Sequence, residues 1–425
     1  MRNERFQEEW TEYTCRSGLK LVLIHKPQFC TSAFLMMTPF GSLDWYQTDP
    51  SGQRSYYEPG TAHFLEHKLF ESGQEDVMRT FSRFGANVNA YTSYDSTVYY
   101  FTTPAEDIFA PLSLLLDFVQ DLSITPASVE KEKPIILEEF ATYQQDPDSR
   151  LFLESMRSIY RTHPLRTDIV GTEKSILRIS EAGLREAYAK NYHPSNMTLI
   201  AVTPHPDELL TEIAERNQSA KHFDPAPAMR RWIEPELPEA AREYDEFLMD
   251  IEQPKSSVTV KLLPAGKDPE QMVLGEWALR FALERQFTAV NPDYQNWIDE
   301  KRITPYFGYE VEYNRDFAFI YFEDVTGEPQ ALRDFVIEQF EQLRKNGIRE
   351  AEIRQMKRRV IGAAVRSFDH PLDMASSWGR GILRSINQFD EVELIGRLNS
   401  NTCLEILDRI GKLYISCVKL APEHG

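Results

Sequence analysis

The stretch "HFLEH" (residues 63–67) places two histidines and a glutamate within five residues, in a chain that contains nine histidines in all. Pro, Gly and Thr stand just ahead of it in "EPGTAHFLEHKLFE", so a helix is expected to begin near Thr61. In a helix, residues i and i+4 lie on one face, about 40° apart, so His63 and His67 can point at one ion. Glu66 would lie beside His63 on the same side.

Two imidazoles with an adjacent carboxylate suit zinc. A catalytic zinc site uses three protein ligands and leaves one position for water. A carboxylate next to that water can take its proton and later return it to a leaving amine, and Glu66 is placed to do so. The order His-x-x-Glu-His is the inverzincin signature. The same pattern also arises by chance on solvated helix faces, so the motif alone leaves both interpretations open.

A third ligand must come from elsewhere in the chain. The segment "EKEKPIILEEF" (residues 130–140) offers four glutamates: Glu130, Glu132, Glu138 and Glu139. Seven residues make nearly two helical turns, so Glu132 and Glu139 share a face, whereas Glu138 is rotated about 100° from Glu139. Glu132 and Glu139 are therefore the best candidate pair. Pro134 complicates the helix, because a proline removes one hydrogen bond and can cause a kink.

Periodicity and turn residues predict an α+β chain. In the first half, the expected strands are 19–25, 31–45 (ending at Gly41) and 196–204, the hairpin is 86–103, and the helices are 107–122, 126–145 and 180–192. In the second half, the expected elements are a strand at 247–263, a hairpin at 307–324, and helices at 271–287, 329–347 and 349–368. Both halves share the order strands, helix, hairpin, helices, which indicates a duplicated unit.

A linker is expected between the two halves. Residues 217–243 contain four prolines and show little periodicity. The predicted domains are therefore 1–216 and 244–425, and a length of 425 residues agrees with two or three domains.

The charge and hydropathy of the chain exclude some functions. A formal charge of −19 repels phosphate backbones, so no nucleic-acid partner is expected. The N-terminal "MRNERFQEEW" lacks the apolar core of a signal peptide, and no run of about 18 apolar residues is present, so no membrane partner is expected. The sequence therefore predicts a cytoplasmic protein.

The two glutamate- and histidine-bearing segments, "HFLEHKLFE" and "EKEKPIILEEF", together resemble the pitrilysin (insulinase) family of zinc metallopeptidases. These are the inverzincins that include the mitochondrial processing peptidases. Three further segments are similar to the family: "GANVNAYTSYDSTVYY" (85–100), "HPLRTDIVGTEKSI" (163–176) and "NYHPSNMTLIAV" (191–202). The resemblance covers most of 19–204 and, less sharply, the second half. It is nearest to the small bacterial insulinase-like peptidases of about this length.

This resemblance implies a role for each residue of the candidate site. It implies His63, His67 and Glu139 as ligands of one zinc ion per active site, with Glu66 as the general base. Glu132 matches the additional acidic residue, seven positions before the third ligand, that supports catalysis in the family.

The resemblance also implies a fold and a way of binding substrate. Family members pair two similar α+β domains, each a mostly antiparallel sheet covered by helices, into a half-clam. Two half-clams enclose a chamber, so a chain of this length needs a second subunit, either a copy or a paralogue. A peptide would add as a strand to the edge formed by residues 86–92, with Asn89 and Ala90 nearest the scissile bond.

Arg302 and Tyr309, in "RITPYFGY", have the spacing of a family pair that holds substrate near zinc. In one interpretation, each subunit of a homodimer supplies this pair to the other subunit's zinc. In the other, the match is accidental and a zinc-less paralogue supplies the real pair. The expected function is a zinc-dependent endopeptidase that hydrolyses short or unfolded peptides in an enclosed chamber. The alternative is a non-catalytic or partner-dependent subunit of a peptidase or peptide-maturation complex.

Overall fold

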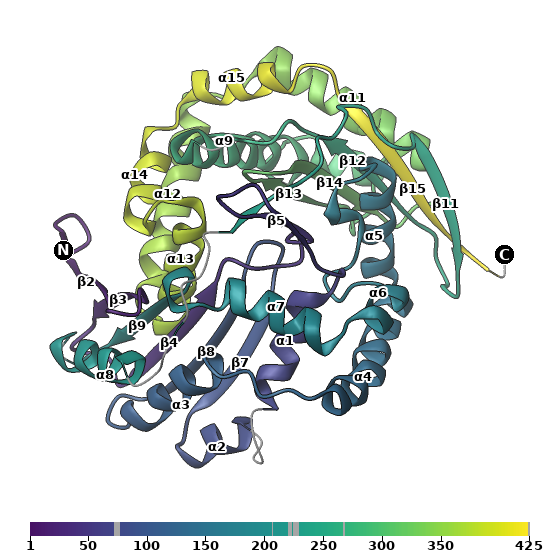
Figure 1. Cartoon of the computed structure of the whole chain (residues 1–425). Helices are drawn as coiled ribbons and strands as arrows, with labels where there is room; N and C mark the ends of the chain where they lie inside the picture. The colour runs from purple at the N-terminus through teal and green to yellow at the C-terminus, as the bar shows by residue number, and fades with distance from the viewer. Residues whose placement is uncertain (72–76, 206, 220–222, 224–228, 267, 424–425) are drawn as a thin grey trace. The chain divides into compact units, whose positions relative to one another are not determined.

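The structure is a computed structural model that describes residues 1–425 except 72–76, 206, 220–222, 224–228, 267 and 424–425 (Figure 1). Its contacts divide the chain into two units. The first unit comprises Met1–Ala141, Asp168–Ile233 and Val365–Leu383. The second unit comprises Thr142–Thr167, Glu234–Ala364 and Arg384–Gly425.

The first unit is built on a seven-stranded sheet with the order β1-β2-β3-β9-β4-β8-β7. Its strands are β1 (Arg2–Asn3), β2 (Glu8–Thr14), β3 (Lys20–His25), β4 (Thr31–Thr38), β7 (Asn87–Thr92), β8 (Thr97–Pro104) and β9 (Thr198–Thr203). All neighbours are antiparallel except β3 and β9, which are parallel. A second sheet has the order β10-β5-β6 and consists of β5 (Tyr46–Thr48), β6 (Arg54–Tyr56) and β10 (Arg230–Arg231).

Helices cover both faces of the seven-stranded sheet. They are α1 (Thr61–Phe70), α2 (Val77–Arg83), α3 (Phe109–Val119), α4 (Pro126–Gln145), α6 (Glu173–Arg178), α7 (Glu181–Asn191), α8 (Asp207–Ser219) and α13 (Pro371–Arg384), with a short 3-10 turn η2 (Pro194–Asn196). Phe34 and Met36 of β4 face the core beneath α1 and α3. The alternate residues Leu35 and Met37 face α13, where Gly379 lies against them. Because β4 is buried on both faces, its sequence is almost continuously apolar.

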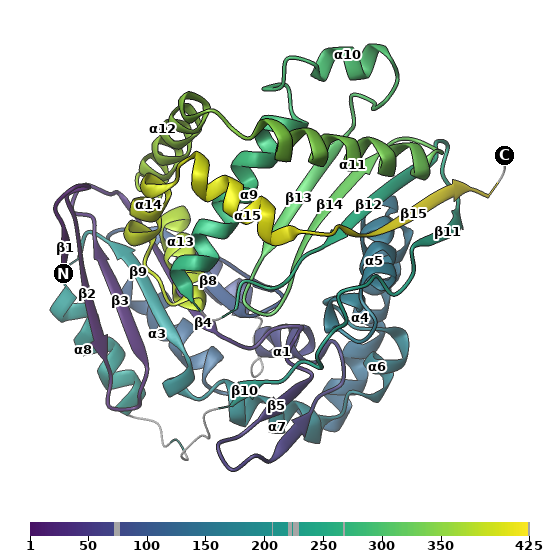
Figure 2. The same ribbon diagram turned by 90° about the horizontal axis from the view of Figure 1, so that it is seen from above.

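The second unit has a five-stranded sheet with the order β11-β15-β12-β14-β13. Its strands are β11 (Tyr244–Met249), β12 (Lys255–Lys261), β13 (Gly308–Tyr313), β14 (Ala318–Asp324) and β15 (Tyr414–Pro422). Its helices are α5 (Pro147–Ile159), α9 (Pro269–Phe287), α10 (Tyr294–Asp299), α11 (Pro329–Asn346), α12 (Glu350–Ser367), α14 (Gln388–Arg397) and α15 (Ser400–Ile410), with a 3-10 turn η1 (Pro164–Arg166). Figure 2 shows α5 beside β15 and β11, where Leu151 packs on Val418 and Leu420.

The two units repeat one topology, which confirms the predicted fold class of two similar α+β domains. Apart from β1 and β2, which extend the first sheet beyond β3, the strands of the two large sheets correspond one to one. The first of these shared strands (β3 or β11) pairs in parallel with the last (β9 or β15). The second strand (β4 or β12) lies between the last strand and the fourth, and the third strand (β7 or β13) lies at the edge. The helix that follows the second strand is α1 in the first unit and α9 in the second.

Each sheet takes one covering helix from the other half of the chain. Helix α5 lies in the first half of the sequence but packs on the second sheet, whereas α13 lies in the second half and packs on the first. The contact-based units therefore differ from the contiguous domains 1–216 and 244–425 expected from composition. An apolar sheet needs cover on both faces, and the chain supplies it by this exchange. Of the expected linker 217–243, residues 220–222 and 224–228 lie outside the described residues.

One local prediction is confirmed in detail and another is wrong. The helix over 126–145 is present, and it continues through Pro134. The single strand expected at 247–263 is instead two strands, β11 and β12, which pair with opposite edges of β15. The break falls at Pro254, which has no backbone N–H to donate to a sheet.

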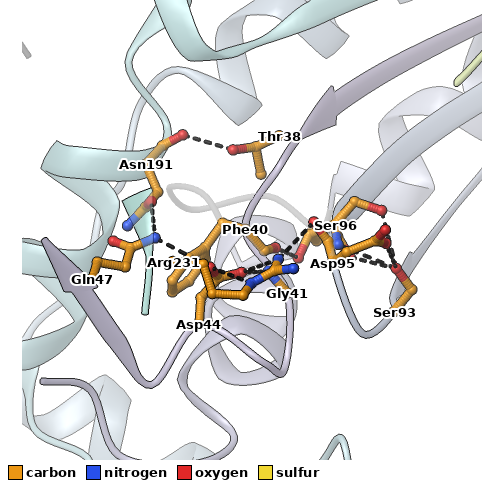
Figure 3. A network of polar contacts seen from close by, with 11 residues as sticks. Thr38, Phe40, Gly41, Asp44, Gln47, Ser93, Asp95, Ser96, Asn191 and Arg231 are labelled. Atoms are coloured by element: carbon orange, nitrogen blue, oxygen red, sulfur yellow. Dashed lines mark hydrogen bonds and ion pairs between the residues drawn. The ribbon is translucent and has the colours of Figure 1, made fainter. Parts of the chain in front are cut away.

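A buried ion pair connects β10 to the loop that follows β4 (Figure 3). The Asp44 carboxylate accepts hydrogen bonds from Arg231 Nε (2.9 Å) and Nη2 (2.8 Å), and from the backbone N–H of Gly41 (2.8 Å). Arg231 also donates to the carbonyl of Asp95 in the β7–β8 turn. A Cβ at Gly41 would lie 2.6 Å from backbone atoms of that turn, so only glycine allows this approach.

We predict that Arg231→Met lowers the free energy of unfolding by about 3–5 kcal/mol, because it leaves the buried Asp44 carboxylate without its cation. Urea titration followed by circular dichroism measures the change. The control is Arg216→Met, which removes an exposed ion pair with Glu212 in α8 and should cost under about 1 kcal/mol. Equal losses in the two variants would contradict the structural role of Asp44–Arg231.

Candidate metal centre and active site

Helix α1 is fixed at its start and buried on one side. Gly60 precedes it with φ of 91°, and a Cβ there would lie 2.2 Å from the carbonyl oxygen of Val170, which explains the glycine before the helix. Phe64 and Leu65 are fully buried in the core. His67, at the end of the helix, is only partly buried.

His63 and His67 converge on Glu139 of α4. Their Nε2 atoms lie 3.5 Å and 3.4 Å from the two carboxylate oxygens of Glu139, and the imidazole centroids are 4.6 Å apart. One ligand atom from each residue falls within 4.8 Å of the other two. Two imidazole nitrogens and one carboxylate oxygen are the donor set of a catalytic zinc site, so the residues present fit this ion.

Glu132 faces the opposite nitrogen of the same imidazole. Its Oε1 lies 3.1 Å from His67 Nδ1, and its side chain is 5% exposed. Sequence spacing does not distinguish the roles of Glu132 and Glu139, but their contacts do. Glu139 faces the nitrogens that are free to bind a metal, whereas Glu132 can accept the Nδ1–H bond that orients a ligand histidine. The other two glutamates of the segment, Glu130 and Glu138, are exposed.

The electrostatics of the metal-free site reflect these contacts. Burial lowers the pKa of His67, but hydrogen bonds to Glu132 and Glu139 outweigh it and raise the pKa to about 9. Hydrogen bonds from His63 and His67 hold the pKa of Glu139 well below its ordinary range. The hydrogen bond from His67 likewise lowers the pKa of Glu132 to about 2. Without metal, the two carboxylates therefore favour the protonated, cationic form of His67.

Glu66 accepts a hydrogen bond from Thr92, a residue that was not predicted from the sequence to belong to the site. Thr92 Oγ1 donates to Glu66 Oε2 at 2.6 Å from the last position of β7. Thr97 Oγ1 lies 3.4 Å from Thr92 Oγ1 and donates to the carbonyl of Phe40. The sequence shows only that Thr92 lies three residues after Asn89, on the core-facing side of the expected strand. This position identifies Thr92 as a partner of Glu66 only if the end of the strand is known to lie against α1.

The strand expected to receive a peptide lies at the edge of its sheet. Among the described strands, β7 pairs with β8 and ends the sheet order. Asn89 is exposed, whereas Ala90 packs against the core. The backbone N–H of Ala90 donates to Asn89 Oδ1 at 2.9 Å, so Asn89 already engages the backbone at the expected binding position.

Arg302 and Tyr309 belong to the second unit and both have contacts within it. Arg302 donates to Glu338 at 2.6 Å, and its guanidinium lies 5.1 Å from the centroid of the Phe335 ring. Tyr309 on β13 packs against the aromatic core beside Phe287, and burial raises its pKa to about 12. The structure therefore accounts for both residues by packing and pairing in their own unit.

The repeated α+β fold and the His63–His67–Glu139 cluster define a class: a chain of two similar α+β units, one of which carries a candidate metal centre. Residues 51–173 match the family model "Insulinase (Peptidase family M16)", and residues 178–360 match "Peptidase M16 inactive domain". Helix α9, the counterpart of α1 within the second matched range, contains no histidine.

Two of the similar proteins described here match nearly the whole chain, and a third matches about half of it. "Uncharacterized zinc protease YmfH" of Bacillus subtilis (strain 168) is 30% identical over 425 residues, which are 99% of this chain and 98% of that protein. The mitochondrial-processing peptidase subunit beta of Neurospora crassa is 29% identical over 219 residues, 51% of this chain and 43% of that protein. The crystal structure of an M16-like peptidase from Alicyclobacillus acidocaldarius matches with a TM-score of 0.91 and 27% identity, covering 98% and 99% of the two chains.

The chain belongs to the insulinase family, peptidase family M16, and a relative that is similar over nearly the whole chain is named a zinc protease. The resemblance drawn from the two motif segments is thereby confirmed. Among the helices of the described residues, none has the length and apolar character needed to cross a membrane.

We predict that the metal-free protein loses stability as pH rises from about 6.5, the unfolded pKa of histidine, to about 9, the pKa of folded His67. Its raised pKa means that the imidazolium stabilises the folded state fully below this window and not above it. The loss should be about 3 kcal/mol, measured by urea titration after chelation. His67→Gln should abolish the dependence, whereas His193→Gln, in a loop away from the cluster, should keep it. An unchanged slope in His67→Gln would refute the assignment.

Proposed function

We propose that this protein is a zinc-dependent endopeptidase that hydrolyses short or unfolded peptides. One observation carries the proposal: the Nε2 atoms of His63 and His67 converge on Glu139, while Glu66 stands between the two histidines in the same helix. A structural metal site has no need of a further carboxylate beside its ligands. A catalytic one uses such a carboxylate as its base.

The residues of the site divide the chemistry among them. His63, His67 and Glu139 would hold zinc, which would supply Lewis-acid polarisation of the peptide carbonyl and lower the pKa of water. Glu66, oriented by Thr92, would take a proton from the attacking water and deliver it to the leaving amine.

The edge strand β7 would bind the substrate by its backbone. An extended peptide would pair with β7 through main-chain hydrogen bonds, with Asn89 and Ala90 nearest the scissile bond. Main-chain pairing places few demands on substrate sequence, which suits the turnover of varied peptides. The cytoplasmic location expected from the sequence remains a prediction.

A second subunit would complete the reaction chamber. The Neurospora relative is named as one subunit of a processing peptidase, which supports an assembly of paired subunits. The partner would be a second copy or a paralogue. In the homodimer, Arg302 and Tyr309 would act on the other subunit's substrate. The ion pair with Glu338 is partly exposed, so a substrate carboxylate or carbonyl could compete for Arg302.

The alternative function is a non-catalytic or partner-dependent subunit. It is favoured by the contacts that already engage Arg302 and Tyr309. It is disfavoured by the complete set of metal-binding side chains with Glu66 beside them. A subunit that only binds peptides or a partner has no use for a general base.

We predict that Glu66→Gln retains zinc and lowers peptide cleavage by about 10²- to 10⁴-fold, because it removes the proton-accepting group without removing a ligand. Fluorogenic peptides measure cleavage, and elemental analysis measures zinc. Glu138→Gln, an exposed glutamate adjacent to the third ligand, is the control and should keep full activity. Cleavage unaffected by Glu66→Gln, or the absence of zinc from the wild type, would overturn the peptidase proposal.

We predict that the isolated chain has twice the monomer mass in solution and cleaves peptides. Arg302→Ala should then lower kcat/KM at least about tenfold with zinc content unchanged, because the substrate loses a cationic contact. Sedimentation and steady-state kinetics are the measurements. A silent Arg302→Ala in an active dimer would contradict the role of Arg302. An inactive monomer that gains activity with an added paralogue would support the partner-dependent alternative.

A further inference from the structure

Lys68, immediately after the second histidine, is a fully buried lysine. Its side chain has no solvent exposure, although an ammonium ion is costly to remove from water. It faces three acceptors: the carboxylate of Glu71, the backbone carbonyl oxygen of Ser128 at 3.1 Å, and Glu132 Oε2 at 3.6 Å. The ammonium thus has two hydrogen-bond acceptors and a third oxygen within ion-pair distance, which together favour one position for the charge.

Glu132 depends on this ammonium for one of its two oxygens. Its Oε1 faces His67 Nδ1, whereas its buried Oε2 has no hydrogen-bond partner within the part of the chain that the structure describes. The Lys68 ammonium is the cation that lies beside this oxygen. Two glutamates, Glu71 and Glu132, therefore both lie next to one buried lysine.

We propose that Lys68 is a positioning residue of the metal centre: it fixes the Glu132 carboxylate so that Glu132 orients His67 with Nε2 toward Glu139. The inference rests on the proposed zinc site. Lys68 does not touch a ligand atom and acts only through Glu132. Without its charge, Glu71 and Glu132 repel one another, Glu132 turns away, and the His67 ring loses the partner that sets its orientation.

The same ammonium also links the two ligand-bearing helices. Lys68 extends from α1, which carries both histidines, while Ser128 and Glu132 lie on α4, which carries Glu139. A contact across α1 and α4 adjacent to the ligands sets their separation. Convergence of His63, His67 and Glu139 requires that separation.

The chain contains a matched control in Lys133. This lysine is also buried, with 9% of its side chain exposed, and it too pairs with a glutamate three residues away and with a backbone carbonyl. Its hydrogen-bond partners are the Glu130 carboxylate and the Leu177 carbonyl, neither of which belongs to Glu132 or a histidine. Lys133→Met therefore reproduces the loss of a buried ammonium without affecting the proposed positioning.

The test measures zinc affinity of the full-length chain by competition with a chromophoric chelator. Lys68→Met should weaken zinc binding by about 10- to 100-fold, whereas Lys133→Met should change it by less than about twofold, although both lower the melting temperature. In Lys68→Met, activity should return when excess zinc is added. If Lys68→Met does not fold, Lys68→Gln keeps a polar end and should weaken zinc binding at least about fivefold.

A double-mutant cycle tests the route through Glu132. Glu132→Gln should weaken zinc binding, and adding Lys68→Met should then produce little further loss, because both act on the same imidazole. Additive losses, equal losses in Lys68→Met and Lys133→Met, or wild-type affinity in Lys68→Met would each overturn the proposal. If the wild type itself binds no zinc, the proposed function fails instead, so the two failures are distinguishable.

Discussion

The need to bury both faces of each central strand governs this structure. Strands β4 and β12 are enclosed on both sides, so a sheet with helices on one face only would leave apolar side chains in water. The chain meets this requirement with α5 and α13, which cross from one half of the sequence to the other sheet. Each half of the sequence therefore supplies one helix that covers the sheet of the other half. The corresponding strands of the two sheets nevertheless have the same order.

The candidate site follows from how α1 is held between its sheet and α4. Phe64 and Leu65 anchor one side of the helix in the core, and the histidines of the same helix meet the carboxylates of α4. Rigid packing on both sides is what allows a few side chains to meet within hydrogen-bond distances. Thr92 adds the edge strand to this arrangement, because its hydrogen bond connects β7 to Glu66 of α1, next to the candidate metal-binding residues.

Local sequence patterns predict most of this arrangement. The remaining features depend on contacts between elements far apart in the sequence, which local patterns do not contain. The helix at 61–70 and the shared face of Glu132 and Glu139 followed from periodicity alone, because i to i+4 and i to i+7 relations are properties of a single helix. Which glutamate faces which nitrogen depends on the approach of α4 to α1, and sequence spacing does not contain it. Lys68 and Thr92 were missed for the same reason, since each acts on a residue of another element.

The hydrogen bond between Asn89 and the Ala90 backbone has a consequence for specificity and solubility. An open strand edge is a template for unwanted pairing with any unfolded chain, including another copy of this one. By satisfying this N–H internally, Asn89 removes one docking point from the edge until a competing strand displaces it. The net value of such a bond is about 1 kcal/mol, equivalent to roughly a fivefold affinity threshold. A strand that formed several main-chain hydrogen bonds along this edge would exceed the threshold, whereas a contact of one or two residues would not.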